Sequence, residues 1–236
     1  MTQQADPTSF NIRSPHYRTL LSAGARFGSY MNTSCVMDYG RSRNWEVSQA
    51  KQLGLVDLTP IPRTGFKGQG VIQWISSQGM EIGQHSNKAY PQQNGMLVGR
   101  LADIEVIILN GLQSRTNQCE SLDEKHACDQ PVRCYLVPRF NTLAWFMVTG
   151  ETSAEVFAKI CGVDLRLKNF SRGAIAQTSV ARINSIIIRH DLKEIPAFHL
   201  LFDSASTEYM WACLMDAYME FKGSPVGYSA IRALVM

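Results

Sequence analysis

The clearest pattern of hydrophobic and polar positions lies in the last third of the chain. Four β-rich runs predict strands there, at residues 134–138, 144–148, 183–189 and 198–202. In the fourth run Phe198, Leu200 and Phe202 point to one face, because side chains alternate along a strand. This face is predicted to be covered by helices.

Two amphipathic segments predict those helices. Thr152 to Glu155 has the Thr-x-x-Glu spacing of a capping box, and Gly162 stands where a helix end favours a positive φ. A second helix is predicted from about Ala205 to Phe221, with its apolar stripe formed by Met210, Leu214, Ala217 and Phe221. The pattern predicts an α+β fold with helices on one face of an antiparallel sheet.

The first half of the chain predicts a similar order of elements. Ser14-Pro15 indicates the start of a helix that ends near Gly24, and Asn94-Gly95 indicates a hairpin turn. Other apolar runs predict strands at 35–39, 55–59, 96–101 and 105–109, and helices that close at Gly54 and Gly79. We predict a disordered N-terminus over 1–13, α+β sub-domains over 14–110 and 132–236, and a polar loop over 111–131 between them.

Composition excludes several classes of protein. Of the 236 residues, 45% are hydrophobic and 18% charged, which is typical of a globular chain. The net charge of +3 comes without a run of Lys and Arg between aromatics, so we expect no nucleic-acid partner. The longest uncharged run, residues 68–80, is too short and polar to span a membrane. Because the start of the chain also lacks the features of a signal peptide, we expect a soluble cytoplasmic protein.

Cys119, His126 and Cys128 form the one cluster of potential metal ligands that the pattern suggests, with Cys134 as a fourth. Eight residues separate Cys119 from Cys128 and five separate Cys128 from Cys134, a spacing that matches no tight zinc knuckle. We therefore expect no metal, with a zinc site as the alternative.

Taken together, the motifs resemble the glycine-cleavage T-protein (aminomethyltransferase) family. The resemblance runs from about residue 14 to the C-terminus and rests on the segments Leu55–Thr59, Gly65–Gly68, Val148–Gly150, Ile188–Arg189, Phe198–Leu200, the helix with Trp211, and Pro225–Ala230. In its short length the chain looks most like the gamma subunit of heterotetrameric sarcosine oxidase. The resemblance implies a T-protein-like fold that lacks the C-terminal barrel of the family.

The chain also departs from the family at its folate site. The family's Asp-Asp loop is replaced by residues 94–100, and of its Arg-Thr-Gly-Tyr-Thr-Gly-Glu hairpin only Arg189 matches. The folate-binding Glu is expected beyond Met236. The resemblance therefore implies that this chain alone binds no cofactor, and that tetrahydrofolate and flavin belong to partner subunits.

Arg189 and Lys67 are the remaining candidates for a folate or substrate contact. Arg189 has the alternative reading of a solvated strand end, and Lys67, between Gly65 and Gly68, lacks the rest of a phosphate loop. His199 is expected at the surface or at an interface, and no catalytic set of residues emerges. We expect an apolar partner surface around Trp45, Trp74 and Phe66 if these are exposed together.

Two functions remain open from the sequence. The first is a non-catalytic gamma-type subunit of a sarcosine oxidase-like or other N-methylamine-demethylating complex, bound to larger flavoprotein subunits and linked to one-carbon metabolism. The alternative is a stand-alone tetrahydrofolate-dependent aminomethyltransferase-like protein with a degenerate folate site. Whether the chain is itself an enzyme stays open between them.

Overall fold

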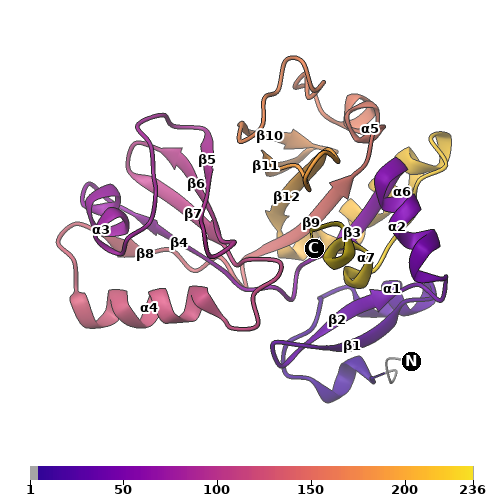
Figure 1. Ribbon diagram of the computed structural model, residues 1–236, viewed down its shortest axis with the longest axis horizontal. Helices are drawn as coiled ribbons and strands as arrows, with labels where there is room; N and C mark the ends of the chain where they lie inside the picture. The colour runs from indigo at the N-terminus through magenta and orange to yellow at the C-terminus, as the bar shows by residue number, and fades with distance from the viewer. Residues whose placement is uncertain (1–4, 236) are drawn as a thin grey trace.

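The computed structural model describes residues 5–235 and builds them around two β-sheets and an N-terminal hairpin (Figure 1). The six-stranded sheet has the order β10-β11-β12-β9-β3-β13, in which β13 runs parallel to β3 and the other neighbours are antiparallel. Its strands are β3 (Gly54–Asp57), β9 (Leu143–Thr149), β10 (Ile175–Val180), β11 (Ile183–Arg189), β12 (Ala197–Asp203) and β13 (Ser224–Pro225).

The antiparallel five-stranded sheet has the order β5-β6-β7-β4-β8. Its strands are β4 (Arg63–Lys67), β5 (Lys88–Pro91), β6 (Leu97–Ala102), β7 (Glu105–Leu109) and β8 (Tyr135–Leu136), and the hairpin consists of β1 (Arg26–Tyr30) and β2 (Thr33–Asp38). The helices are η1 (Pro7–Ser9), α1 (Tyr17–Ser22), α2 (Arg43–Leu53), α3 (Val71–Ser77), α4 (Gln118–Asp129), α5 (Ser153–Ile160), η2 (Ser204–Ser206), α6 (Thr207–Glu220) and α7 (Tyr228–Val235). Within residues 5–235, no helix has both the length and the apolar character needed to cross a membrane.

The sheets and helices stack as layers. Phe198, Leu200 and Phe202 of β12 pack with the predicted apolar stripe of α6 in one core, so the prediction of helices on this face is confirmed. A second core fills the space between the two sheets, where Met147 of β9 and Ile107 of β7 belong to one cluster. A third core lies between the five-stranded sheet and helices α3 and α4. Figure 1 shows α3 and α4 on the side of this sheet away from the six-stranded sheet.

The predicted division into two consecutive sub-domains does not match the distribution of the strands. β3, from the first half, pairs with β9 in the six-stranded sheet, and β8, predicted to open the second sub-domain, pairs with β4 in the five-stranded sheet. The chain therefore crosses between the sheets twice. Hydrophobic periodicity predicts that a strand exists, but it does not specify which strand is the neighbour.

The predicted polar loop over residues 111–131 is also corrected, because it contains α4. Only Cys119 and Leu122 are buried on this helix, a stripe too narrow to produce a clear helical period in the sequence. Asn117 caps it by accepting a hydrogen bond from the Glu120 backbone N–H at 3.0 Å.

The N-terminal segment is structured from Ala5 onward, in contrast to the predicted disorder over residues 1–13. The Ala5 N–H donates to the Phe27 carbonyl at 2.9 Å, the Ser34 N–H donates to the Ile12 carbonyl at 2.9 Å, and Pro7 is buried. These backbone bonds join the segment to the hairpin. Residues 1–4 of that prediction lie outside the described residues.

Two details of helix capping differ from the prediction. The Thr152 hydroxyl donates to the Gln52 carbonyl at 3.1 Å instead of capping α5. The helix ends at Cys161 in an extended conformation, and Gly162 does not adopt a positive φ. Tertiary contacts with α2 thus replace the local capping box.

A buried arginine joins the two crossings between the sheets. Arg63 is 2% exposed, and its guanidinium donates to the carbonyls of Thr59 (2.9 Å) and Ile61 (2.8 Å) in the first crossing. It also donates to the carbonyls of Phe140 (2.7 Å) and Leu143 in the second. Burial lowers the pKa of Arg63 to about 9, so it stays protonated at neutral pH. One cation therefore pairs four loop carbonyls.

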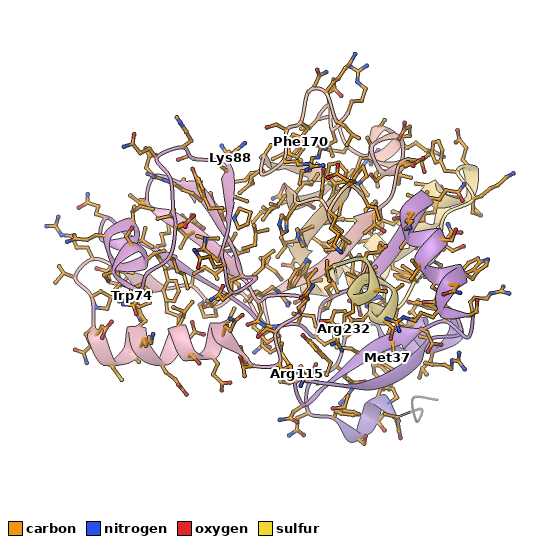
Figure 2. The ribbon with its side chains drawn as sticks, in the orientation of Figure 1. Met37, Trp74, Lys88, Arg115, Phe170 and Arg232 are labelled. Carbon is orange, nitrogen blue, oxygen red and sulfur yellow. The ribbon has the colours of Figure 1, made fainter. Side chains whose placement is uncertain are left out.

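A second contact joins the sheets at the opposite edge. The Ala89 N–H of β5 donates to the Gly173 carbonyl at 2.7 Å, and Lys88 Nζ donates to the Arg172 carbonyl at 3.1 Å. Figure 2 shows Lys88 near Phe170, where the two halves of the molecule approach. The sheets are thus held together at two separated places.

We predict that Arg63→Met lowers the free energy of unfolding by about 3 kcal/mol or more, because several buried carbonyls lose their donors. Arg115→Met, at an exposed position, is the matched control and should change it by less than about 0.5 kcal/mol. Urea unfolding of both variants measures the difference. Equal stability of the two variants would show that Arg63 does not hold the crossings.

Candidate functional site

A cavity of about 450 Å³ opens where the two sheets meet the end of α7. It is lined on the side of the five-stranded sheet by the turn at Asn94-Gly95 and by Leu97 and Leu109. Residues of the six-stranded sheet and of the following loop line the other side, among them Trp145, His190, Asp191, Lys193 and His199. Its walls combine leucines and one tryptophan with a larger number of polar side chains, so the cavity can contact both apolar and hydrogen-bonding parts of a small molecule.

His199 on β12 presents an unsatisfied hydrogen-bond donor beside this cavity. The indole N–H of Trp145 donates to His199 Nδ1 at 3.0 Å. Because an indole nitrogen can only donate, Nδ1 is the acceptor and the imidazole proton is on Nε2. His199 is 2% exposed, and its Nε2 has no partner among the described residues. A buried donor of this kind is costly to leave unpaired.

The two histidines of the cavity are neutral at physiological pH. Burial holds the pKa of His199 well below its ordinary value, and the neighbouring His190 lowers it further. Burial also lowers the pKa of His190, although Asp191 opposes the shift. Their rings stack with centroids 5.8 Å apart. The two histidines of the cavity are therefore neutral imidazoles, and Lys193 is the cationic side chain in its lining.

Arg189 lies close to the cavity, but its donors are already used. Its Nε and Nη2 donate to the two carboxylate oxygens of Asp191 at 2.9 and 2.8 Å. Its Nη1 donates to the carbonyls of Leu167 and Phe170 at 2.9 and 2.6 Å. At 7% exposure Arg189 is not the solvated strand end that the sequence suggested. It fixes the loop before β10 and the hairpin after β11.

Asp191 is likewise committed to ion pairs. Besides Arg189, Arg172 donates to its Oδ2 at 2.7 Å. Burial would raise the pKa of Asp191, but the hydrogen bonds and charge of Arg189 and the bond from Arg172 outweigh it and lower the pKa. The cavity thus contains a carboxylate with no oxygen free of an arginine.

Lys67 is not brought to the cavity. It lies at the end of β4 and pairs with Glu105 at 3.1 Å, with its side chain 55% exposed. Arg139 holds the other oxygen of Glu105 at 2.5 Å. The two predicted ligand-binding residues, Arg189 and Lys67, are therefore both engaged in ion pairs and do not share a site.

The weak metal candidates occupy different sides of α4. Cys119 is buried with its thiol directed to the Ile108 carbonyl at 3.7 Å, whereas Cys128 is exposed. His126 Nε2 contacts the Cys134 carbonyl at 2.9 Å, and its ring packs against Trp74. Within residues 5–235 no cluster of three or more His, Cys, Asp or Glu has the geometry of a metal site. Cys128 comes nine positions after Cys119, which places the two side chains on opposite sides of the helix.

Two further expectations about exposure are wrong. His199 is buried rather than at the surface, because β12 has neighbours on both sides and both its faces are covered. Phe66 and Trp74 belong to the core beneath α3 and α4, and of the three aromatics only Trp45 is exposed. The exposed apolar residues lie elsewhere, notably Val132 (82%) and Tyr135 (66%) at β8.

Comparison with known proteins gives a consistent assignment of family and fold. The model of the GCVT N-terminal domain family matches residues 16–236. No curated protein matches the chain. Among solved structures, the glycine cleavage system aminomethyltransferase T of Bartonella henselae superposes with a TM-score of 0.73 at 15% identity. The match covers 95% of this chain and 62% of that one, so this chain spans about three fifths of the length of that protein.

A second solved structure is the heterotetrameric sarcosine oxidase from Corynebacterium sp. U-96 in complex with pyrrole 2-carboxylate. One of its chains superposes with a TM-score of 0.62 at 18% identity, over 78% of this chain and 97% of that one. At these identities the likeness establishes the fold. The predicted T-protein-like α+β fold is thereby confirmed.

We predict that His199 makes the folded protein less stable in mild acid. Its pKa is lower in the folded than in the unfolded state, so below about pH 6.5 the unfolded chain binds a proton that the folded chain does not bind. The free energy of unfolding therefore falls as the pH falls. His199→Gln, which keeps an acceptor for Trp145, should reduce the loss of stability between pH 7 and pH 5 by up to about 1.4 kcal/mol per pH unit.

Urea unfolding at the two pH values tests this, with His85→Gln at an exposed position as the control. The control should lose as much stability as the wild type. If His199→Gln loses as much as well, His199 is not the buried neutral group described here.

Proposed function

We propose a role for this chain, which belongs to the GCVT N-terminal domain family. It serves as a non-catalytic, gamma-type subunit of a cytoplasmic amine-demethylating flavoenzyme complex. The complex would be of the sarcosine oxidase type and would supply one-carbon units to tetrahydrofolate. Flavin and folate would be held by larger partner subunits. The observation that carries the proposal is the pairing of the cavity's carboxylate, Asp191, with two arginines.

The carboxylate and the buried histidine of the cavity are not arranged as an acid–base or nucleophilic set. Its carboxylate, Asp191, is held by Arg189 and Arg172. His199 accepts from Trp145 and is neutral, and it has no described carboxylate partner that would orient it as a base. These residues can bind and orient a molecule, but they do not form a base next to a nucleophile.

Tetrahydrofolate, the ligand that the family implies, does not fit the cavity residues well. A buried pterin has ring N–H groups that need acceptors, and a free carboxylate is the strongest one. Here the unsatisfied group, His199 Nε2, is itself a donor. The cavity's carboxylate, Asp191, is held by two arginines and offers no free carboxylate to the pterin, so we derive no reaction step through folate on this chain.

The likeness to a chain of heterotetrameric sarcosine oxidase supports the subunit proposal. That chain is matched over 97% of its length, whereas the aminomethyltransferase is matched over 62%. A stand-alone aminomethyltransferase-like protein remains the second candidate. It is favoured by the cavity itself, whose 450 Å³ is within the usual size of a small-molecule site.

An exposed apolar segment, Val132 to Leu136, is suited to contact a partner subunit. Val132 is 82% exposed, Tyr135 66% and Leu136 40%. β8 also forms an edge of the five-stranded sheet, where backbone groups are open to another strand. Tyrosine at such a place is typical of protein interfaces.

We predict that the isolated chain binds tetrahydrofolate weakly or not at all, because each unpaired buried polar group costs about 1–3 kcal/mol. Calorimetric titration with the reduced folate, alongside a Trp145 fluorescence titration, measures this. Micromolar binding at the cavity would favour the aminomethyltransferase-like candidate instead.

We also predict that the chain, expressed alone, shows no oxidase or transferase turnover, but elutes in a one-to-one ratio with the large flavoprotein subunit when the two are co-expressed. The double variant Val132→Ser, Tyr135→Ser should weaken that complex by about tenfold or more, since exposed apolar anchors dominate binding energy. Met219→Ser, 70% exposed on α6, is the control and should leave it unchanged.

Transfer of a one-carbon group to tetrahydrofolate by the chain alone would contradict the subunit proposal. Loss of the complex in Met219→Ser with an unaffected double variant would instead move the contact surface to α6.

A further inference from the structure

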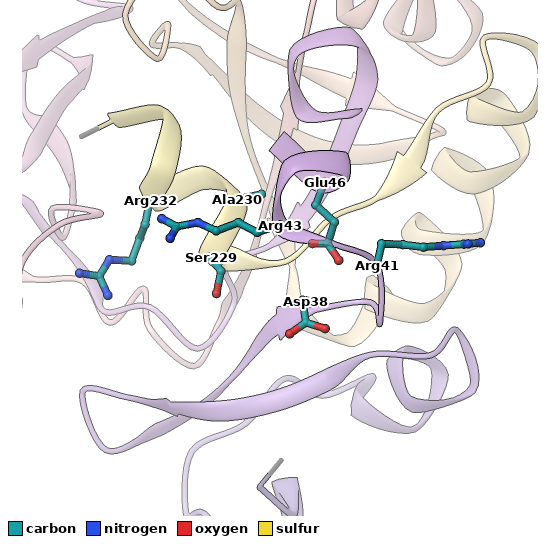
Figure 3. Close-up of a pocket in the computed structure, with 7 residues that line it drawn as sticks. All are labelled: Asp38, Arg41, Arg43, Glu46, Ser229, Ala230 and Arg232. Atoms are coloured by element: carbon teal, nitrogen blue, oxygen red, sulfur yellow. The ribbon is translucent and has the colours of Figure 1, made fainter. Parts of the chain in front are cut away.

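A pocket rich in arginine lies where β2, α2 and α7 meet. Its volume is about 400 Å³, and it is lined by Asp38, Arg41, Arg43, Glu46, Ser229 and Arg232, together with Ala230 (Figure 3). No part of the proposed function uses it. Three arginines and two carboxylates line the pocket. What it can bind depends on which of these charges are already paired within the protein.

Both carboxylates already have partners within the protein, Glu46 at both oxygens and Asp38 at Oδ1. Glu46 is 1% exposed, and its two oxygens accept the backbone N–H groups of Tyr39 (2.6 Å) and Gly227 (2.8 Å). Asp38 Oδ1 pairs with Arg26 Nε at 2.5 Å and accepts the Gly40 N–H at 2.8 Å. The acidic residues therefore hold the end of β2 and the start of α7 against α2.

The arginines, in contrast, have no acidic partner. No ion pair within residues 5–235 involves Arg41, Arg43 or Arg232. Arg41 stacks on the Trp45 ring, with its guanidinium carbon 5.4 Å from the ring centroid. The Nε of Arg232 is buried and has no hydrogen-bond partner among the described residues. Arg43 and Arg232 thus contribute unpaired positive charge.

The side chains of Arg43, Arg232 and Ser229 are positioned to contact a single bound anion. Figure 3 shows Arg43 and Arg232 extending to the same side of α7, with the Ser229 hydroxyl near them, while Arg41 extends away. The two helices pack against each other, and each begins at the pocket, α2 at Arg43 and α7 at Tyr228. Helix N-termini add positive potential at that point.

We propose that this pocket binds the phosphate group of a small molecule, held by Arg43, Arg232 and the Ser229 hydroxyl. Two guanidinium groups and a hydroxyl supply more donors than the two oxygens of a carboxylate accept, whereas a phosphate presents at least three oxygens. Arginine is also the side chain best suited to pair with phosphate in two-pronged geometry. The ligand is free phosphate or a phosphomonoester, which share this chemistry.

Titration of the full chain with inorganic phosphate and with glycerol 3-phosphate, at constant ionic strength, tests the proposal. ³¹P line broadening and calorimetry give the affinities, and acetate is the carboxylate comparison. We expect one phosphate-bearing probe to bind at one site per chain, at least about tenfold tighter than acetate. Tighter binding of glycerol 3-phosphate than of phosphate identifies an ester ligand, and the reverse identifies the free ion.

Variants locate the site. Arg43→Gln changes an exposed residue and should weaken binding about tenfold or more, and Arg43→Gln with Arg232→Gln should abolish it. Lys125→Gln with Lys168→Gln removes the same charge from two exposed positions on other elements and should leave the affinity unchanged. Urea unfolding confirms that each variant is folded.

Three results would each overturn the assignment. They are no binding of either phosphate probe to the wild type, acetate binding as tightly as phosphate, and equal weakening by the arginine and lysine variants. None of these outcomes bears on assembly with a flavoprotein subunit, so this proposal and the proposed function fail separately.

Discussion

The burial of one positive charge, that of Arg63, is the constraint on which the arrangement of the two sheets depends. The chain leaves the six-stranded sheet after β3 and returns to it before β9, and both crossings expose carbonyls that no strand pairs. Arg63 donates to Thr59 and Ile61 on one crossing and to Phe140 and Leu143 on the other. Because Arg63 forms no ion pair within residues 5–235, these carbonyl dipoles, together with the nearby charge of Asp57, compensate its burial.

The same crossings position the cavity. The Leu58 N–H donates to the Trp145 carbonyl at 2.8 Å, and Thr59 Oγ1 accepts the Trp145 backbone N–H at 3.2 Å. Trp145 in turn fixes the tautomer of His199 through its indole N–H. The orientation of the open donor at His199 Nε2 therefore follows, through three sets of contacts, from the loop that Arg63 holds.

The sequence predicted the elements better than their environment. The alternation at Phe198, Leu200 and Phe202 indicated a strand with one apolar face, and that face was placed correctly. His199 lies between these residues, and it was predicted at the surface or at an interface because an alternating pattern usually indicates one buried and one exposed face. β12 lies between β11 and β9, with the second core on its other face, so both sets of side chains are buried. Pairing between distant strands, which decides this, has no signal in a single sequence.

The same limit applies to the arginines, because the sequence does not reveal which of them the fold pairs with a carboxylate or a carbonyl. Arg189 matched a family motif, yet the fold supplies it with Asp191 and two carbonyls, so no donor is left for a ligand. Arg43 and Arg232 matched no motif, yet the fold places them together while their acidic neighbours are engaged elsewhere. An arginine is available to a ligand only where the protein leaves its charge uncompensated, and that is a property of the assembled structure. In this chain Arg43 on α2 and Arg232 on α7 keep their charge uncompensated at one pocket, whereas Arg189 does not.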